Sequence, residues 1–159
     1  MTFEIYTDGS TKNNGYTNSV GGWGYVVLQN GEKVHSNGGA EFGTTNQRME
    51  LTAAIEGIEH TLNDLCVPFD KVVVYTDSAY LHNCYTQKWY RNWERNGWVN
   101  SKKQPVANKD LWERLIKYFE SPEIDFVKVK GHAGNQWNEY VDDIAQSAAD
   151  SLKISMENK

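Results

Sequence analysis

The sequence has few of the residues that mark secreted or membrane proteins. Two cysteines, Cys66 and Cys84, stand among 159 residues, which excludes a disulfide framework and favours reduced thiols in an intracellular compartment. No apolar run approaches the roughly 18–20 residues that span a bilayer. Residues 1–10 lack the charged segment and apolar run of a signal peptide. We therefore expect a cytoplasmic protein that does not associate with membranes.

An excess of positive charge is also missing. The chain carries 16 Lys and Arg against 21 Asp and Glu, a formal net charge of −5. This balance argues against a uniformly basic nucleic-acid-binding domain but leaves room for local basic clusters. The length fits one domain, and an apolar fraction of 39% is enough for a core. Aromatic residues are plentiful, with six Trp and nine Tyr.

Hydrophobic patterns predict an alternation of strands and helices. A strand over 3–7 should end at Asp8-Gly9-Ser10, a turn signal. Segments 22–28 and 32–36 flank Asn30-Gly31, a hairpin signal, so we expect the first three strands to form an antiparallel meander. Further strands are expected over 71–76, covered on both faces, and 124–130, with helices over 45–61, 78–85, part of 87–109, 110–119 and 139–153, and a frayed tail over 156–159. This order implies one mixed sheet with helices on its faces.

Two aspartates follow similar apolar strands. Asp8 and Asp77 each come after a Tyr-Thr pair at the end of such a strand, and strand ends of an open sheet are where sites form. Neighbouring carboxylates repel unless a hard divalent cation binds between them. Taken singly, Asp8 before Gly9 fits a turn slightly better, and Asp77 fits a helix N-cap equally well. The pair therefore indicates a metal site more strongly than either residue.

Other candidates are weaker when taken from the residues alone. Glu50 fits a solvated helix surface, and Asp142 and Asp143 both fit exposed positions on the last helix. His132 lies in a glycine-rich loop, where most histidines are merely solvated, although imidazole is a natural proton shuttle. A site with carboxylates, no cysteine and one loop histidine favours Mg²⁺ or Mn²⁺ over zinc, and with it phosphoryl chemistry.

Four segments together resemble type 1 ribonuclease H over nearly the whole chain. They are YTDGS at 6–10, TTNQRMEL at 44–51, YTDS at 75–78, and GHAG at 131–134 followed by Asn138-Glu139 and Asp142. The resemblance implies a ribonuclease H-like α/β fold: a five-stranded mixed sheet, with three antiparallel and then parallel strands, and helices on both faces. It also implies one catalytic domain over about 1–155, which we expect to be a stand-alone monomer with no protein partner to infer.

The resemblance assigns roles to the acidic residues. It implies that Asp8, Glu50, Asp77 and Asp142 bind metal and that His132 assists product release or proton transfer. Asp142 is preferred over Asp143 because it keeps the family spacing. The implied reaction is endonucleolytic hydrolysis of the RNA strand of RNA–DNA hybrids, leaving 5′-phosphate and 3′-hydroxyl ends. Two Mg²⁺ ions about 3.5–4 Å apart in the substrate complex, with Mn²⁺ as a substitute, would serve it.

Segment 87–109 is basic and rich in Trp within an acidic chain. It carries six Lys and Arg against Glu94 as its only acid, together with Trp89, Trp93 and Trp98. A solvated helix and loop whose Trp residues pack on the core is the plainer interpretation, and we favour it for Trp93. The resemblance makes the segment the family's basic protrusion, with Trp89 against DNA sugars and cations on phosphates. Contacts of this kind carry little sequence specificity.

The resemblance also implies which residues contact the RNA–DNA hybrid. The RNA 2′-hydroxyl would be read by Asn14, Asn46, Gln47 and Glu50, and a DNA phosphate pocket would use Thr45 and Asn108. The loop that holds Asn14 is longer than usual for the family. Gly43 stands where many members have Arg, and several protrusion positions are uncharged: Asn96, Val99, Gln104 and Ala107. We therefore expect weaker hybrid binding than in a strongly basic relative, with the chemistry retained.

Three rival functions remain. Resolvase or transposase cores share an acidic cluster but lack the segment at 44–51 and the Trp-rich protrusion. A catalytically inactive hybrid-binding module would not need all four carboxylates. The ribonuclease H portion of a reverse transcriptase is less favoured, because the chain begins with Met1 and ends in a short tail.

Overall fold

A five-stranded mixed sheet is the centre of the molecule, as expected from the sequence. The computed structural model describes residues 2–12, 18–64, 70–129 and 135–157. The strand order is β3-β2-β1-β4-β5. β2 pairs antiparallel with both β1 and β3, whereas β4 pairs parallel with both β1 and β5. The strands are β1 (Thr2–Lys12), β2 (Val20–Gln29), β3 (Glu32–Phe42), β4 (Lys71–Thr76) and β5 (Ile124–Lys128).

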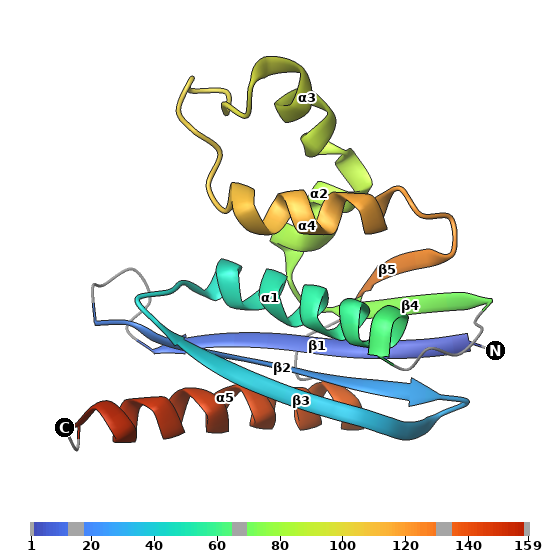
Figure 1. Cartoon of the computed structure of the whole chain (residues 1–159), viewed down its shortest axis with the longest axis vertical. Helices are drawn as coiled ribbons and strands as arrows, with labels where there is room; N and C mark the ends of the chain where they lie inside the picture. The colour runs from blue at the N-terminus through green and yellow to red at the C-terminus, as the bar shows by residue number, and fades with distance from the viewer. Residues whose placement is uncertain (1, 13–17, 65–69, 130–134, 158–159) are drawn as a thin grey trace.

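Helices lie on both faces of this sheet (Figure 1). Helix α1 covers one face and α5 the other, and α2, α3 and α4 stack on the side of α1, with α3 farthest from the sheet. No helix in the described ranges is long and apolar enough to cross a membrane. The helices are α1 (Asn46–Glu59), continued by the π-helical η1 (His60–Asp64), α2 (Ala79–Gln87), α3 (Trp89–Asn96), α4 (Lys109–Phe119) and α5 (Gln136–Glu157).

One apolar face of α1, the helix predicted over 45–61, forms the main core with the sheet. Leu51, Ala54, Ile55 and Ile58 are fully buried against it, and each large aliphatic side chain stabilises the fold by about 1.5–3 kcal/mol when buried. The helix begins where Thr45 Oγ1 accepts a hydrogen bond from Arg48 N at 3.2 Å, so Thr45 is the N-cap.

Strand β1 continues through the residues that were predicted to form a turn. Gly9 pairs with Trp23 in the middle of the β1–β2 ladder, and its φ is not in the left-handed region. A Cβ atom at this position would lie 2.5 Å from Glu50 N. The turn prediction was therefore wrong: this glycine is needed for the close approach of α1, and not for a reversal of the chain.

Burial along β4 also differs from the prediction. Val72 and Val74 are fully buried, but Val73 and Tyr75 on the opposite face are only half-buried. The reason is the placement of α5, which packs closely on β1, β2 and β3. A Cβ atom at Gly22 of β2 would lie only 1.9 Å from the carbonyl oxygen of Ala145 on α5.

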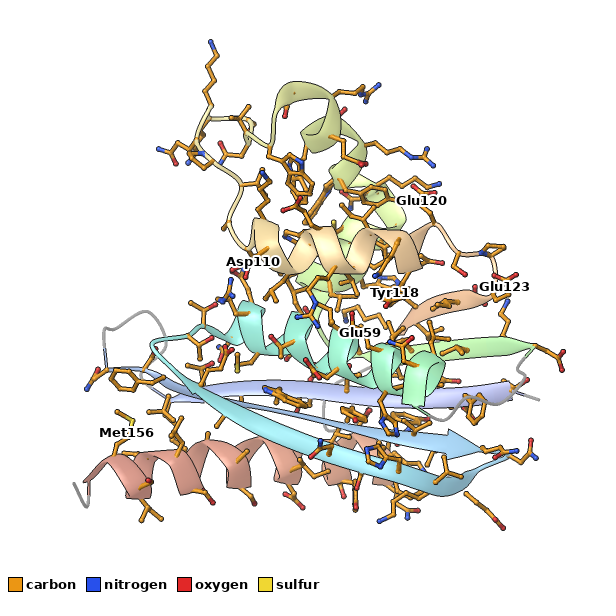
Figure 2. The ribbon with its side chains drawn as sticks, in the orientation of Figure 1. Glu59, Asp110, Tyr118, Glu120, Glu123 and Met156 are labelled. Atoms are coloured by element: carbon orange, nitrogen blue, oxygen red, sulfur yellow. The ribbon has the colours of Figure 1, made fainter. Side chains whose placement is uncertain are left out.

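Helix α5 is longer than its apolar pattern indicated. Asn135 Oδ1 accepts hydrogen bonds from the backbone N of Trp137 at 2.9 Å and of Asn138 at 3.2 Å, and these bonds set the start of the helix. At the other end the helix runs to Glu157, and Met156 lies on its last turn (Figure 2). The predicted frayed tail is therefore wrong for 156 and 157, since no Gly or Pro ends the helix before them.

Candidate active site

Two strands bring the first pair of carboxylates together. The parallel pairing of β1 with β4 ends at Tyr6 opposite Tyr75, so Asp8 and Asp77 come just beyond the last paired residues. Asp8 still lies inside β1, because that strand continues against β2, whereas Asp77 follows the end of β4. Neighbouring strands therefore deliver both side chains as expected, although only Asp77 stands at a strand end.

Glu50 reaches the same point from α1. The close approach of the helix backbone at Gly9 places Glu50 beside β1. One carboxylate oxygen from each of Asp8, Glu50 and Asp77 lies within 4.8 Å of the other two. Asp8 is buried and the other two are half-buried, so the three acids form a compact group, and all three line one cleft.

Asp142 lines this cleft from α5. The cleft has a volume of about 340 Å³ and is also lined by Asn46 and Gln146. Gln146 Nε2 donates a hydrogen bond to Asp142 Oδ2 at 2.8 Å, and Asp142 lies close enough to Asp8 to help raise the pKa of that carboxyl group. Asp143 is exposed and is not among the residues that line the cleft. The Asp142–Gln146 contact was missed in the sequence, although the i, i+4 spacing on a helix signals it.

The crowded carboxylates change one another's ionisation. Burial, followed by the charge of Asp77 and a hydrogen bond with Asp142, raises the pKa of Asp8 to about 8. Burial is also the main cause that raises the pKa of Glu50 well above its ordinary value, and the charge of Asp8 adds to it. Full ionisation of this group at neutral pH therefore requires a compensating positive charge.

A hard divalent cation fits this group of residues. Glu50 Oε2 is buried and has no hydrogen-bond partner within the described parts of the chain, so one acceptor is left for a ligand. All of the donor atoms are carboxylate oxygens, which suit Mg²⁺ or Mn²⁺ better than zinc or copper. The observed arrangement thus supplies what a metal site of this kind needs: several negative oxygens, close together and partly shielded from water.

The proposed hybrid-recognition residues are only partly described. Asn46 and Gln47 lie on the exposed first turn of α1, and Asn46 reaches the acidic cleft. Glu50 lies one turn further along the same helix, inside the cleft. Asn14 and His132 lie outside the residues that the structure describes, so their predicted roles stay predictions.

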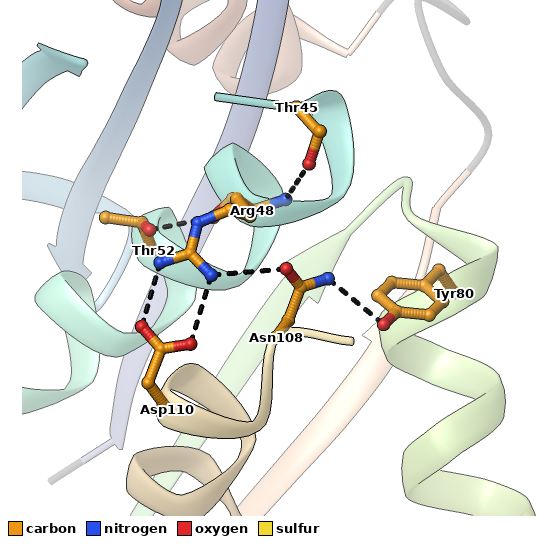
Figure 3. Close-up of polar contacts among 6 residues, drawn as sticks. All are labelled: Thr45, Arg48, Thr52, Tyr80, Asn108 and Asp110. Atoms are coloured by element: carbon orange, nitrogen blue, oxygen red, sulfur yellow. Dashed lines mark hydrogen bonds and ion pairs between the residues drawn. The ribbon is translucent and has the colours of Figure 1, made fainter. Parts of the chain in front are cut away.

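Thr45 and Asn108 are linked through one arginine (Figure 3). Arg48 N donates to Thr45 Oγ1 at 3.2 Å, and Arg48 Nη1 donates to Asn108 Oδ1 at 3.2 Å. The guanidinium also forms a two-point ion pair with Asp110, at 3.0 and 2.8 Å, which raises the pKa of Arg48 and lowers the pKa of Asp110. The sequence did not indicate Arg48 or Asp110, because no local pattern joins residues so far apart along the chain.

The basic protrusion lies on α3 and the loop that follows it, farther from the sheet than the other helices on that side (Figure 1). Trp89, Trp93 and Trp98 pack against the main core, as expected for Trp93. Trp89 is half-buried, and its Nε1 donates to Gln87 Oε1 at 2.9 Å. A hollow of about 630 Å³ is lined by residues of the protrusion that include Trp89, Trp93 and Arg95. The basic residues of the protrusion are all exposed: Lys88, Arg91, Arg95, Lys102, Lys103 and Lys109.

Comparison with known proteins adds independent information. A family model described as RNase H matches residues 1–150. The ribonuclease H of Moorella thermoacetica is 44% identical over 149 residues, which cover 94% of this chain and 92% of the relative. LC9-RNase H1, a type 1 RNase H with the type 2 active-site motif, is 29% identical with a TM-score of 0.78, over 94% of this chain and 72% of that one. LC11-RNase H1 in complex with RNA/DNA hybrid is 23% identical with a TM-score of 0.65, over 94% and 98%, and shows likeness of fold alone.

Proposed function

The chain belongs to the ribonuclease H family, and from that premise we propose that it is an endonuclease that hydrolyses the RNA strand of RNA–DNA hybrids. The observation that carries the proposal is the group of Asp8, Glu50 and Asp77, whose carboxylate oxygens lie within 4.8 Å of one another. The relative that is 44% identical over 94% of this chain is named a ribonuclease H, which supports cleavage of an RNA strand. The expected products have 5′-phosphate and 3′-hydroxyl ends.

The carboxylates of the cleft hold and orient the reacting groups. Asp8, Glu50, Asp77 and Asp142 would bind two Mg²⁺ ions in the substrate complex, with Mn²⁺ as a substitute. When bound, such ions neutralise charge on the scissile phosphate and activate the attacking water. Asp8 provides a buried ligand that the β1–β2 ladder holds rigidly. His132 would act in proton transfer or product release.

Glu50 has a second task in this proposal. It lies on the same helix face as Asn46, which also lines the cleft, so the two side chains face the same bound strand. A 2′-hydroxyl both donates and accepts hydrogen bonds, and it distinguishes RNA from DNA. Glu50 would accept from this hydroxyl, while Asn46, Gln47 and Asn14 would contact it or its neighbours.

The DNA strand would be held away from the acidic cleft. The exposed cations of the protrusion neutralise phosphates, and Trp89 offers a partly exposed ring to the sugars. Thr45 and Asn108, which Arg48 links, would bind one DNA phosphate. None of these groups reads base edges, so we expect little sequence specificity. We further propose that the protein acts as a cytoplasmic monomer.

The experiment that tests the proposal compares substrates and metals. Labelled RNA–DNA hybrid, RNA duplex and DNA duplex are incubated with Mg²⁺, Mn²⁺ or EDTA. We expect cleavage of the RNA in the hybrid alone, and none with EDTA. Asp8→Asn and Asp77→Asn should each abolish cleavage, whereas Asp125→Asn, at a half-buried acid paired with Lys71 at 2.7 Å, should not. Robust DNA cleavage, activity in EDTA, or hybrid binding without cleavage by the unaltered protein would contradict the proposal.

A further inference from the structure

The hydroxyl group of Tyr80 lies where α2 meets α4. It accepts a hydrogen bond from Trp112 Nε1 at 3.1 Å. It accepts another from Asn108 Nδ2 at 3.2 Å, which Figure 3 shows. An indole N–H can only donate, so the bond from the fully buried Trp112 fixes the hydroxyl oxygen as an acceptor. The two rings also make an edge contact, with centroids 5.1 Å apart. Tyr80 is therefore held firmly on both its ring and its oxygen.

The Asn108 amide is fixed from two sides. Arg48 donates to its Oδ1 at 3.2 Å, and since a guanidinium has no acceptor, this contact decides which amide atom is the oxygen. The opposite atom is then Nδ2, and one of its two N–H groups goes to Tyr80. The second N–H makes no hydrogen bond to any residue in the described ranges, and the side chain does not cap α4.

Arg48 contributes orientation more than free positive charge. Its guanidinium is paired with both oxygens of Asp110, so much of its charge is already neutralised. Its backbone N also binds Thr45 Oγ1, which accepts that bond and keeps its own hydroxyl hydrogen for another acceptor. The linked residues therefore offer an anion two neutral donors, the Thr45 O–H and one Asn108 N–H.

We propose that Tyr80 is a positioning residue that holds the Asn108 amide with one N–H ready for a DNA-strand phosphate. The inference rests on the proposed function, because it takes Asn108 as a phosphate ligand. Without the Tyr80 hydroxyl, the Asn108 amide keeps only its bond to Arg48 and can swing away from the position that a phosphate oxygen requires. Tyr80 would thus act on substrate binding through Asn108, and it does not touch the reacting atoms.

Steady-state kinetics on a short RNA–DNA hybrid test this role. Tyr80→Phe keeps the ring and removes the hydroxyl, and we expect KM to rise about three- to tenfold, the value of one oriented hydrogen bond, with kcat within about twofold. In the Asn108→Ala background the same change should raise KM by less than about twofold, since the positioned amide is gone. Tyr118→Phe is the matched control: its hydroxyl donates to Glu59 at 3.5 Å, near the other end of α4 (Figure 2), and its KM should not change.

A measurement on the unaltered protein covers the case in which Tyr80→Phe does not fold. With EDTA present to prevent cleavage, the same hybrid is titrated while the side-chain amide protons of Asn108 are followed by NMR. We expect two distinct resonances in the free protein, and a shift on binding that is larger for one of them. Equal or absent shifts would overturn the inference.

The results separate this inference from the proposed function. If the unaltered protein cuts the hybrid and Asn108→Ala raises KM, but Tyr80→Phe does not, only the role of Tyr80 is wrong. If the increases in KM caused by Tyr80→Phe and Asn108→Ala multiply in the double variant, the role of Tyr80 is also overturned. Such a result would mean that Tyr80 affects hybrid binding independently of Asn108. An unaltered protein that neither binds nor cuts the hybrid overturns both.

Discussion

The acidic cleft and the basic protrusion differ in how far their charged side chains are buried. In the cleft, Asp8 is buried in the middle of a paired strand, and its pKa is raised to about 8. In the protrusion, charges such as Lys102 and Lys103 are exposed on a loop between short helices. Buried like charges are strongly coupled and need a partner, whereas exposed charges contribute singly and are screened by salt. The cleft should therefore respond steeply to single changes, and the protrusion gradually.

The largest effects should follow changes in the cleft. Asp142→Asn should lower kcat at least about 100-fold, because removing one oriented charge-stabilising group from an active site costs about that much. Asp143→Asn, one residue along the same helix but exposed, should change kcat less than about twofold. Cleavage of labelled hybrid under substrate saturation measures both. Greater damage from Asp143→Asn would show that the last ligand has been misplaced.

The raised pKa of Asp8 predicts how stability depends on pH. Folding lifts this pKa from its ordinary 3.8 to about 8, so between these values the folded state holds a proton that the unfolded state has released. The stabilisation is fully present below pH 4 and is lost as pH rises through about 8, by about 1.4 kcal/mol per pH unit for each such proton. Urea unfolding without metal should therefore show falling stability from pH 5 to pH 8, within the window between these pKa values.

Two further unfolding series sharpen this result. Mg²⁺ should restore stability most at high pH, where it replaces the missing protons. Asp8→Asn should make the decline shallower, because one of the two groups with a raised pKa is gone while Glu50 remains. Asp125→Asn, at a half-buried position outside the cleft, should leave the decline unchanged. A stability that rises between pH 5 and pH 8 without metal would contradict the raised pKa.

The protrusion should respond with moderate changes that depend on salt. Arg95→Gln combined with Lys102→Gln removes two exposed cations, and we expect KM for the hybrid to rise about tenfold at low salt while the slope of log KM against log salt falls by about 2. The double change Lys128→Gln and Lys153→Gln alters the net charge equally at exposed positions outside the protrusion. Equal effects of the two pairs would mean that only the net charge matters.

Local patterns in the sequence predicted much of this molecule, and non-local contacts account for what was missed. The hairpin at Asn30-Gly31 and the helix α1 are each encoded by a local pattern of residues, and both predictions are confirmed. Gly9 was misread because a turn and a close approach favour the same residue. The place of Glu50 in the cleft depends on that approach, so from the residues alone it fitted an ordinary surface position.

The hydrogen bonds around the proposed phosphate pocket could not be predicted from the sequence, because they also join residues far apart along the chain. Arg48 and Asp110 are 62 residues apart, and Tyr80 and Asn108 are 28 apart. No periodicity or spacing joins such pairs; they meet only once α1, α2 and α4 have packed together. The family resemblance identified Asn108 as a candidate phosphate ligand, whereas the structure revealed the side chains that hold Asn108 in place.

The smallest effect should come from Gln146, which contacts the cleft from its exposed rim. Its Nε2 donates to Asp142 Oδ2 at 2.8 Å, and this bond orients the carboxylate. Because the bond is exposed to water, Gln146→Leu should weaken Mg²⁺ binding only about threefold. Calorimetric titration of the protein with Mg²⁺ measures this directly, with Ser147→Ala as a neighbouring exposed control. Tighter Mg²⁺ binding by Gln146→Leu would mean that Gln146 competes with the metal for Asp142, and not that it prepares Asp142 to bind.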